Sequence, residues 1–154
     1  MSVHEIASEP VEIAAPAELV WSILVDLPSY GRWNPLNRRV ESTLEIGSPV
    51  KLWISDPAVA RAGDVFVHRL VAFEPPKHIA WEYRSDEPVA VRTRRDQYVT
   101  ALGPERCTYY TTDRFDGPGA AALMEAYGAS VAASFARLSQ ALRDYAEKKW
   151  RSGT

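Results

Sequence analysis

Apolar residues in the first third of the chain recur at two different spacings. The segment from Val3 to Ala14 is compatible with an extended strand, and Pro16 follows at a position where proline favours the first turn of a helix. From Ala17 to Val25 the spacing becomes helical, and Pro28 stops the run. The pattern therefore predicts a strand and then a helix of about two and a half turns, whose apolar positions are Leu19, Val20, Trp21, Ile23 and Leu24.

The stretch DLPSYGRWNP, from Asp26 to Pro35, cannot form a long helix or a regular strand. Pro28 and Pro35 bracket it, and each proline biases its predecessor toward extended geometry. We therefore expect a turn or a second short helix here.

Between Arg38 and Phe115 the chain shows runs rich in β-branched and aromatic residues, separated by Gly, Pro and Asp. Each separating stretch is short enough to join antiparallel neighbours. We therefore predict a meander of six strands, which are Arg38 to Leu44, Val50 to Ser55, Asp64 to Glu74, His78 to Ser85, Val89 to Leu102 and Glu105 to Phe115.

After Gly119 the pattern predicts one long amphipathic helix that ends near Lys149, because its apolar residues lie three and four positions apart. The fold class is therefore α+β, with seven antiparallel strands that must bury one face against this helix. One helix cannot cover so wide a sheet. A curved sheet wrapped around it leaves an apolar cavity, which is the usual form of a small-molecule site.

Composition limits the number of domains and the classes of partner that we expect. A chain of 154 residues and 17.2 kDa fits one domain, expected at 1–149 with a flexible tail at 150–154. A formal net charge of -2 does not favour nucleic acid as a partner.

The only cysteine, Cys107, excludes an intramolecular disulfide, and the N-terminus lacks the apolar core of a signal peptide. No apolar run reaches the ~20 residues that span a bilayer. We expect a cytoplasmic protein, a monomer or a homodimer.

Four strings of the sequence, in this order along the chain, resemble the SRPBCC superfamily, the START-like helix-grip proteins that include polyketide cyclases and dehydrases. APAELVW, from Ala15, is similar to the entrance into the first helix of that superfamily, and DLPSYGRWNP to its D-x-x-x-Y-x-x-W-N-P segment. FEPPKHIAW, from Phe73, is similar to its proline hairpin and tryptophan strand. DRFDG, from Asp113, is similar to the strand exit before the last helix.

The resemblance implies a helix-grip fold, a seven-stranded curved sheet around the C-terminal helix with two short helices between the first and second strands. It implies function less closely, because one fold hosts many activities. The leading hypothesis is binding of a small hydrophobic molecule, lipid-like or polyketide-like, between sheet and helix. The alternative is a polyketide cyclase, aromatase or dehydratase that acts on a reactive carbonyl compound without a cofactor. A third possibility is a partner-binding module whose cavity is filled by its own side chains.

Strand alternation gives candidate residues for the cavity wall. If residues 103–105 form a three-residue hairpin loop, Leu102 lies opposite Arg106 and Arg95 lies opposite Asp113 on the less charged face. Arg95 and Asp113 then form a cross-strand pair, which either fixes the sheet register or orients a polar ligand. The same count places Gln97 opposite Thr111 and Val99 opposite Tyr109.

The strand from Asp64 to Glu74 has no clean apolar face, so either His68 or Arg69 faces the cavity. The catalytic candidates are Arg95, Asp113, Arg69 and His68. Arg95 with Asp113 would polarise a carbonyl, Arg95 or Arg69 would stabilise an enolate, and a tyrosine or His68 would move the proton. In the long helix, Leu123, Met124, Tyr127 and Val131 should overlook the cavity. The expected ligand-binding residues are Trp33, Trp81, Tyr83, Gln97, Tyr109, Thr111, Met124, Tyr127 and Val131.

Two further expectations concern Trp33 and metals. In a helix-grip arrangement the short helices lie at the open end of the sheet, so Trp33 serves either as a structural plug, anchored on the sheet or on the C-terminal helix with Tyr30 at its edge, or as a ligand contact. Because the three histidines are scattered and have no cysteine partners, we predict no metal site. We also expect no cofactor.

Overall fold

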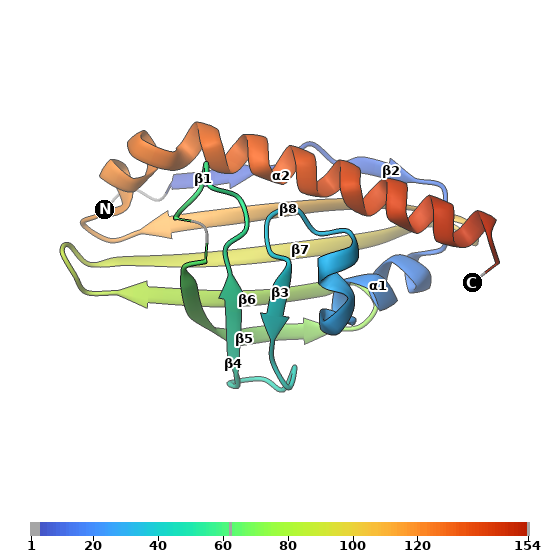
Figure 1. Cartoon of the computed structure of the whole chain (residues 1–154), viewed down its shortest axis with the longest axis horizontal. Helices are drawn as coiled ribbons and strands as arrows, with labels where there is room; N and C mark the ends of the chain where they lie inside the picture. The colour runs from blue at the N-terminus through green and yellow to red at the C-terminus, as the bar shows by residue number, and fades with distance from the viewer. Residues whose placement is uncertain (1–3, 62, 154) are drawn as a thin grey trace.

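The computed structural model describes residues 4–61 and 63–153 of the chain. Its elements follow the predicted order of strand, two short helices, strands and one long helix (Figure 1). They are β1 (His4–Ala7), β2 (Val11–Ile13), α1 (Ala17–Val25), the 3-10 helix η1 (Leu27–Arg32), β3 (Arg39–Glu41), β4 (Pro49–Trp53), β5 (Val65–Glu74), β6 (His78–Ser85), β7 (Val91–Gly103), β8 (Arg106–Asp116) and α2 (Ala120–Arg151).

The strands form one antiparallel sheet in the order β1-β8-β7-β6-β5-β4-β3, and β2 also pairs with β8. The single first strand expected from Val3 to Ala14 is therefore wrong: the sheet has eight strands in the described residues, not seven. Pro10 interrupts the first strand because it has no N–H to donate. Ser8 bridges the gap, since its backbone N–H donates to Thr111 O and its Oγ accepts from Thr111 N, both at 2.9 Å. Val3 lies outside the described residues.

Five of the six strands predicted between Arg38 and Phe115 differ in extent from the structure, four of them by only one or two residues at an end. The first central strand covers only Arg39–Glu41 rather than Arg38 to Leu44, because Leu44 has a φ of 59°, a left-handed conformation that no strand accommodates. At the last hairpin Gly103, not Leu102, lies opposite Arg106, so the loop has two residues instead of three. A register shift between Ala101 and Gly103 absorbs the difference, and the predicted pairing beyond it is unchanged.

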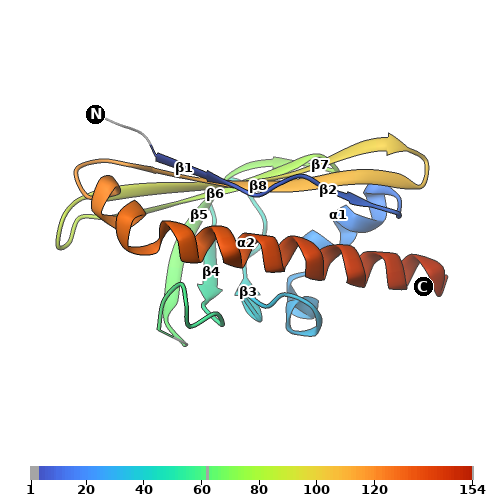
Figure 2. The ribbon, with the colours of Figure 1, turned by 90° about the horizontal axis from the view of Figure 1, so that it is seen from above.

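The long helix α2 lies along one side of the curved sheet. It contacts β1, β2, β8 and α1. At the other edge of the sheet, β3 and β4 bend toward the side on which α2 lies, as Figure 2 shows. The axis of α2 therefore stands away from the inner faces of the central strands and leaves space between the helix and the sheet. The helix runs past Lys149 to Arg151, so the tail expected at 150–154 begins with helical residues. The single-domain expectation stays a prediction.

The turn from β8 into α2 passes very close to the start of β7. Gly117 has a φ of 99°, and a Cβ there would lie 3.1 Å from Ala90 O. Gly119 donates its N–H to the same carbonyl at 2.8 Å. Because only glycine tolerates both the conformation and the close approach, this turn ties the start of α2 to the hairpin between β6 and β7.

The segment after α1 fills one end of the sheet. Tyr30 and Trp33 are buried, and their rings meet edge to face with centroids 5.2 Å apart. Trp33 also stacks on Tyr145 of α2 at 6.4 Å. Trp33 is therefore anchored on the C-terminal helix with Tyr30 at its edge, as one of the two predicted arrangements states.

A buried hydrogen bond joins η1 to α1. The Leu24 carbonyl would accept from the residue four positions later, but that residue is Pro28, which has no N–H. The Tyr30 hydroxyl donates to Leu24 O at 2.5 Å instead. The tyrosine thus satisfies the carbonyl that the proline leaves open at the end of α1.

We predict that Tyr30→Phe lowers the free energy of unfolding by about 1–3 kcal/mol, because the buried Leu24 carbonyl loses its side-chain partner. Urea denaturation at neutral pH measures this. Tyr127→Phe is the matched control, since Tyr127 is 44% exposed and its hydroxyl has no hydrogen bond within the described residues. Equal midpoints and slopes for Tyr30→Phe and the wild type would contradict the prediction.

Candidate functional site

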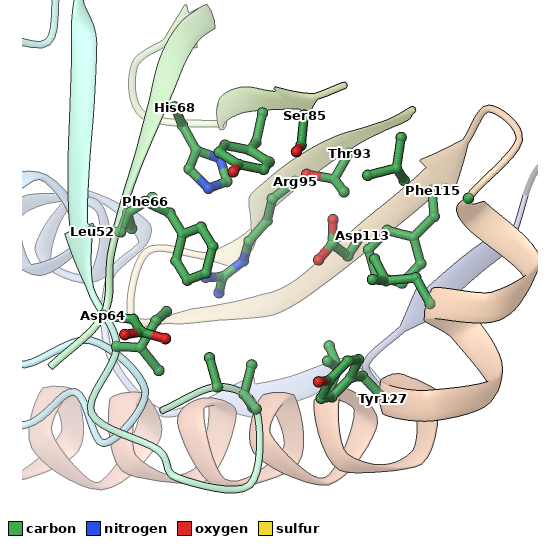
Figure 3. A pocket seen from close by; sticks show the side chains of 18 of the residues that line it. Leu52, Asp64, Phe66, His68, Ser85, Thr93, Arg95, Asp113, Phe115 and Tyr127 are labelled. Atoms are coloured by element: carbon green, nitrogen blue, oxygen red, sulfur yellow. The ribbon is translucent and has the colours of Figure 1, made fainter. Parts of the chain in front are cut away.

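A cavity of about 840 Å³ lies between the sheet and the first half of α2. Its walls come from the inner faces of β4 to β8, from the connection between β4 and β5, and from the hairpin between β6 and β7. Most of the lining is apolar, with aromatic surfaces from Phe66, Trp81, Tyr83, Phe115, Tyr127 and Phe135. Figure 3 shows His68, Arg95 and Asp113 directed into it from the sheet and Tyr127 from the helix.

The sheet register brings the polar lining residues together. Arg95 of β7 lies between Trp81 of β6 and Asp113 of β8 in one row across the sheet. Successive residues of a strand point to opposite faces, so these three side chains share the cavity face. The predicted pairing of Arg95 with Asp113 is confirmed, and both residues line the cavity.

Arg95 is held rigidly and is only 7% exposed. Its Nε donates to Thr111 Oγ1 at 3.1 Å, and its Nη2 donates to Gln97 Oε1 at 3.5 Å. The guanidinium carbon lies 4.8 Å from the centroid of the Phe135 ring, in the range of a cation–π contact. Every one of these partners is electrically neutral. The structure therefore fixes a buried cation on the cavity wall.

Three residues expected to line the cavity instead support Arg95 from behind. Gln97, Thr111 and Tyr109 point inward as the alternation predicts, but they are buried where the sheet meets the core and do not line the cavity. Tyr109 Oη donates to Gln97 Oε1 at 2.6 Å, and Thr111 Oγ1 donates to the Asp96 carbonyl at 2.7 Å. This network orients the two acceptors of Arg95.

Asp113 has a carboxyl group that burial makes hard to ionise. Its Oδ1 is buried and has no hydrogen-bond partner, and the residue makes no ion pair with Arg95 within the described chain. The pKa of Asp113 is raised to about 7, because burial and, to a smaller extent, the negative charge of Asp96 outweigh the opposing positive charge of Arg95. The expected Arg95–Asp113 ion pair is therefore wrong, although the residues lie opposite each other.

His68 lies on the cavity wall with its ring centroid 5.1 Å from that of Tyr83. Its Nδ1 is buried without a hydrogen-bond partner. Burial, together with the positive charge of Arg95, lowers the pKa of His68 to about 3. The imidazole is therefore neutral at physiological pH.

The structure also decides between His68 and Arg69. His68 faces the cavity, and Arg69 lies on the outer face of β5 opposite Glu82 of β6. Two other expected contacts lie elsewhere: Trp33 is in the plug described above, and Met124 packs beside Gly128, one position away from the cavity-facing stripe of α2. The expected residues that do line the cavity are His68, Trp81, Tyr83, Arg95, Asp113, Leu123, Tyr127 and Val131.

The connection from β4 to β5 contributes a wall that the sequence pattern does not reveal. Its buried Asp56 accepts hydrogen bonds from Ser134 Oγ at 2.8 Å and from Arg137, both on α2. Asp56 also accepts from the Ala58 N–H at 3.0 Å. These bonds hold Val59 and Ala60 against the cavity. We call Asp56 with Ser134 and Arg137 the loop clamp.

Neither a metal centre nor a membrane span is found in the described ranges. No group of three or more His, Cys, Asp or Glu side chains there could hold a metal ion. No helix there is long and apolar enough to cross a membrane.

Comparisons with known proteins place the chain among proteins of this architecture. A family model described as "Polyketide cyclase / dehydrase and lipid transport" matches residues 4–147. The Zhui aromatase/cyclase from Streptomyces sp. R1128 is 24% identical over 99% of this chain and 98% of that chain, with a TM-score of 0.77. A START superfamily protein from Mycobacterium smegmatis is 21% identical over 94% and 98% of the chains, with a TM-score of 0.66. At these identities the solved structures show the fold alone. The search of curated proteins found no match.

We predict that Asp56→Ala lowers the free energy of unfolding by about 1–3 kcal/mol, because the buried Ser134 hydroxyl loses its acceptor. Asp64→Ala is the control, since Asp64 makes only an exposed pair with Arg61 at 3.9 Å. Chemical denaturation measures both variants. An equal loss in the two would contradict a specific role for the clamp.

The difference in stability between the wild type and Asp56→Ala depends on pH. Burial raises the pKa of Asp56, but hydrogen bonds from Ala58, Arg137 and Ser134 outweigh burial, so the folded-state pKa lies below the ordinary value. The folded state therefore binds fewer protons than the unfolded state in this range. The advantage of the wild type over Asp56→Ala is present above about pH 4 and is lost as the pH falls through the folded-state pKa.

Proposed function

The chain belongs to the polyketide cyclase/dehydrase and lipid transport family, and from this membership we propose that it binds a small hydrophobic molecule, lipid-like or polyketide-like, in the cavity. The observation that carries the proposal is the cavity volume of about 840 Å³. Ligand pockets usually measure about 300–1,000 Å³ and combine apolar walls with a few polar groups. A module whose cavity is filled by its own side chains would lack this space.

The form of the walls favours a flat body with few oxygen atoms. Phe66 and Tyr83 meet edge to face at 5.5 Å on one side, and Phe115 lies on another strand. Aromatic faces contribute large apolar contact areas, and a tyrosine adds a hydroxyl at the edge of its ring. Arg95 and Asp113 lie opposite each other on neighbouring strands of the cavity wall, so one polar end of a ligand can reach both.

We predict that native mass spectrometry of the protein purified from its source organism shows a bound compound at one molecule per chain. Ala126→Trp should reduce its occupancy at least about tenfold, because Ala126 lines the cavity and an indole would take up part of the space. Ala129→Trp is the control, since Ala129 is exposed on the same helix and does not line the cavity. Equal occupancy in the two variants would contradict binding in the cavity.

A second candidate function is cyclisation, aromatisation or dehydration of a reactive carbonyl compound. It is favoured by three polar groups that converge on one cavity: Arg95, Asp113 and His68. Arg95 would stabilise negative charge that develops on a carbonyl oxygen when the neighbouring carbon loses a proton. The proton acceptor is better assigned to Asp113 than to His68, because a pKa of about 7 suits transfer at neutral pH and a pKa of about 3 does not. Two similar structures are an aromatase/cyclase and a di-domain ARO/CYC, the second 14% identical with a TM-score of 0.69.

We predict that, if the co-purified compound is converted, Arg95→Met lowers kcat/KM about 100-fold or more by removing the only buried cation of the described cavity wall. Asp113→Asn should lower kcat and remove the limb of the pH–rate profile near pH 7. Arg84→Met, on the outer face of β6, is the control for both. Unchanged turnover in both cavity variants, with the fold retained, would exclude this mechanism and leave binding as the function.

A further inference from the structure

The charges around the cavity do not balance. Of the charged residues that line it, Arg61 is exposed and Asp64 is half-buried, and the two pair with each other at 3.9 Å. Glu87 is exposed on the hairpin between β6 and β7. The charge of the interior therefore depends on Arg95 together with Asp113, because His68 is neutral.

Arg95 has hydrogen-bonding capacity that the protein leaves unused. A guanidinium has five N–H groups, and two of those of Arg95 have acceptors, Thr111 and Gln97. The Tyr109 hydroxyl lies close enough to accept from a third, which leaves two N–H groups without an acceptor within the described chain. No carboxylate there forms an ion pair with this side chain, although an unpaired buried charge is among the costliest groups in a folded protein. The acceptors of these groups must come from outside the chain, as water or as a ligand in the cavity.

We propose that the ligand is an organic acid: a largely apolar molecule with one carboxylate, which occupies the free edge of the Arg95 guanidinium beside the Asp113 carboxyl group. This inference rests on the proposed binding function and specifies its ligand class. A carboxylate accepts two parallel N–H bonds from a guanidinium, which matches the unused donors. It also brings the single negative charge that the interior lacks.

Neutral ligands and dianions fit less well. A neutral molecule would exclude water from Arg95 and still leave its charge unbalanced, which costs free energy. A phosphate monoester, with a charge of about -1.5 to -2 at neutral pH, would exceed the single charge of Arg95. A monoanion satisfies both limits.

Asp113 completes the site as a donor. Below pH 7 its carboxyl is mostly protonated, so its O–H can donate to the bound carboxylate while Arg95 donates from the other side. Above pH 7 the ionised Asp113 repels the ligand and competes for Arg95. Binding should therefore weaken as the pH rises through about 7. The other charged or titratable groups that face this space are His68, Tyr83, Tyr127 and, at the rim, Arg61, Asp64 and Glu87.

The test uses probes that differ only in charge. Anthracene-2-carboxylic acid and its methyl ester represent a flat ligand, and dodecanoic acid and its methyl ester represent a chain. Isothermal titration of the full chain at pH 6 should show each acid binding about 10- to 100-fold more tightly than its ester, as a hydrogen-bonded charge pair requires. Arg95→Met should remove that preference and leave ester affinity within about threefold.

Two further variants keep the test decisive if Arg95→Met fails to fold. Asp113→Asn should keep the preference for the acid and make its affinity nearly constant between pH 6 and 8, where the wild type loses affinity. Arg84→Met, an arginine on the outer face of the sheet, should change neither property.

Each outcome has one interpretation. Tighter acid binding that depends on Arg95 supports the ligand class. Esters that bind as tightly as acids, with no effect of Arg95→Met, overturn the ligand class and leave the proposed binding function intact. If no probe binds and no compound co-purifies with the wild type, both proposals fail.

Discussion

The width of a single α-helix, about 10 Å with its side chains, is the constraint on which the rest of this structure depends. Neighbouring strands lie about 4.8 Å apart, so α2 can cover roughly two of them. It packs on β1, β2 and β8 at one edge of the sheet. The inner faces of the central strands must then be covered by something else or remain open. The plug around Trp33 closes one end, and the loop clamp holds one wall against α2. What remains uncovered is the cavity.

The polar groups of the cavity depend on rigidity behind the wall. A lone arginine side chain can adopt many rotamers, but Arg95 is fixed by Thr111 and Gln97, and Gln97 is fixed in turn by Tyr109. These supports lie on long central strands whose backbone hydrogen bonds allow little movement. The direction of the charge is therefore set before any ligand arrives. Such preorganisation lowers the free-energy cost of ordering a site on binding.

Much of the fold could be predicted from sequence, because its main signals are local. The helix from Ala17 to Val25 and the strand from His78 to Ser85 have the predicted bounds. The site was less accessible to such reasoning. Alternation gives the face of Thr111 and Gln97, but not whether that part of the face meets the cavity or the core. The loop clamp joins Asp56 to a helix 78 positions later, which no local pattern can indicate.

The unpaired state of Arg95 and Asp113 illustrates the limit most clearly. Register places the two residues opposite each other, and opposite charges in that arrangement usually pair. Here Thr111 and Gln97 hold the guanidinium, and burial raises the pKa of Asp113 to about 7, so that its carboxyl group is partly protonated at neutral pH. A salt bridge would have left a neutral wall with no demand for a charged ligand. The neutral acceptors Thr111 and Gln97 hold the guanidinium, and Arg95 forms no ion pair with Asp113. The two residues therefore form a site with an unpaired positive charge instead of a salt bridge that only fixes the sheet register.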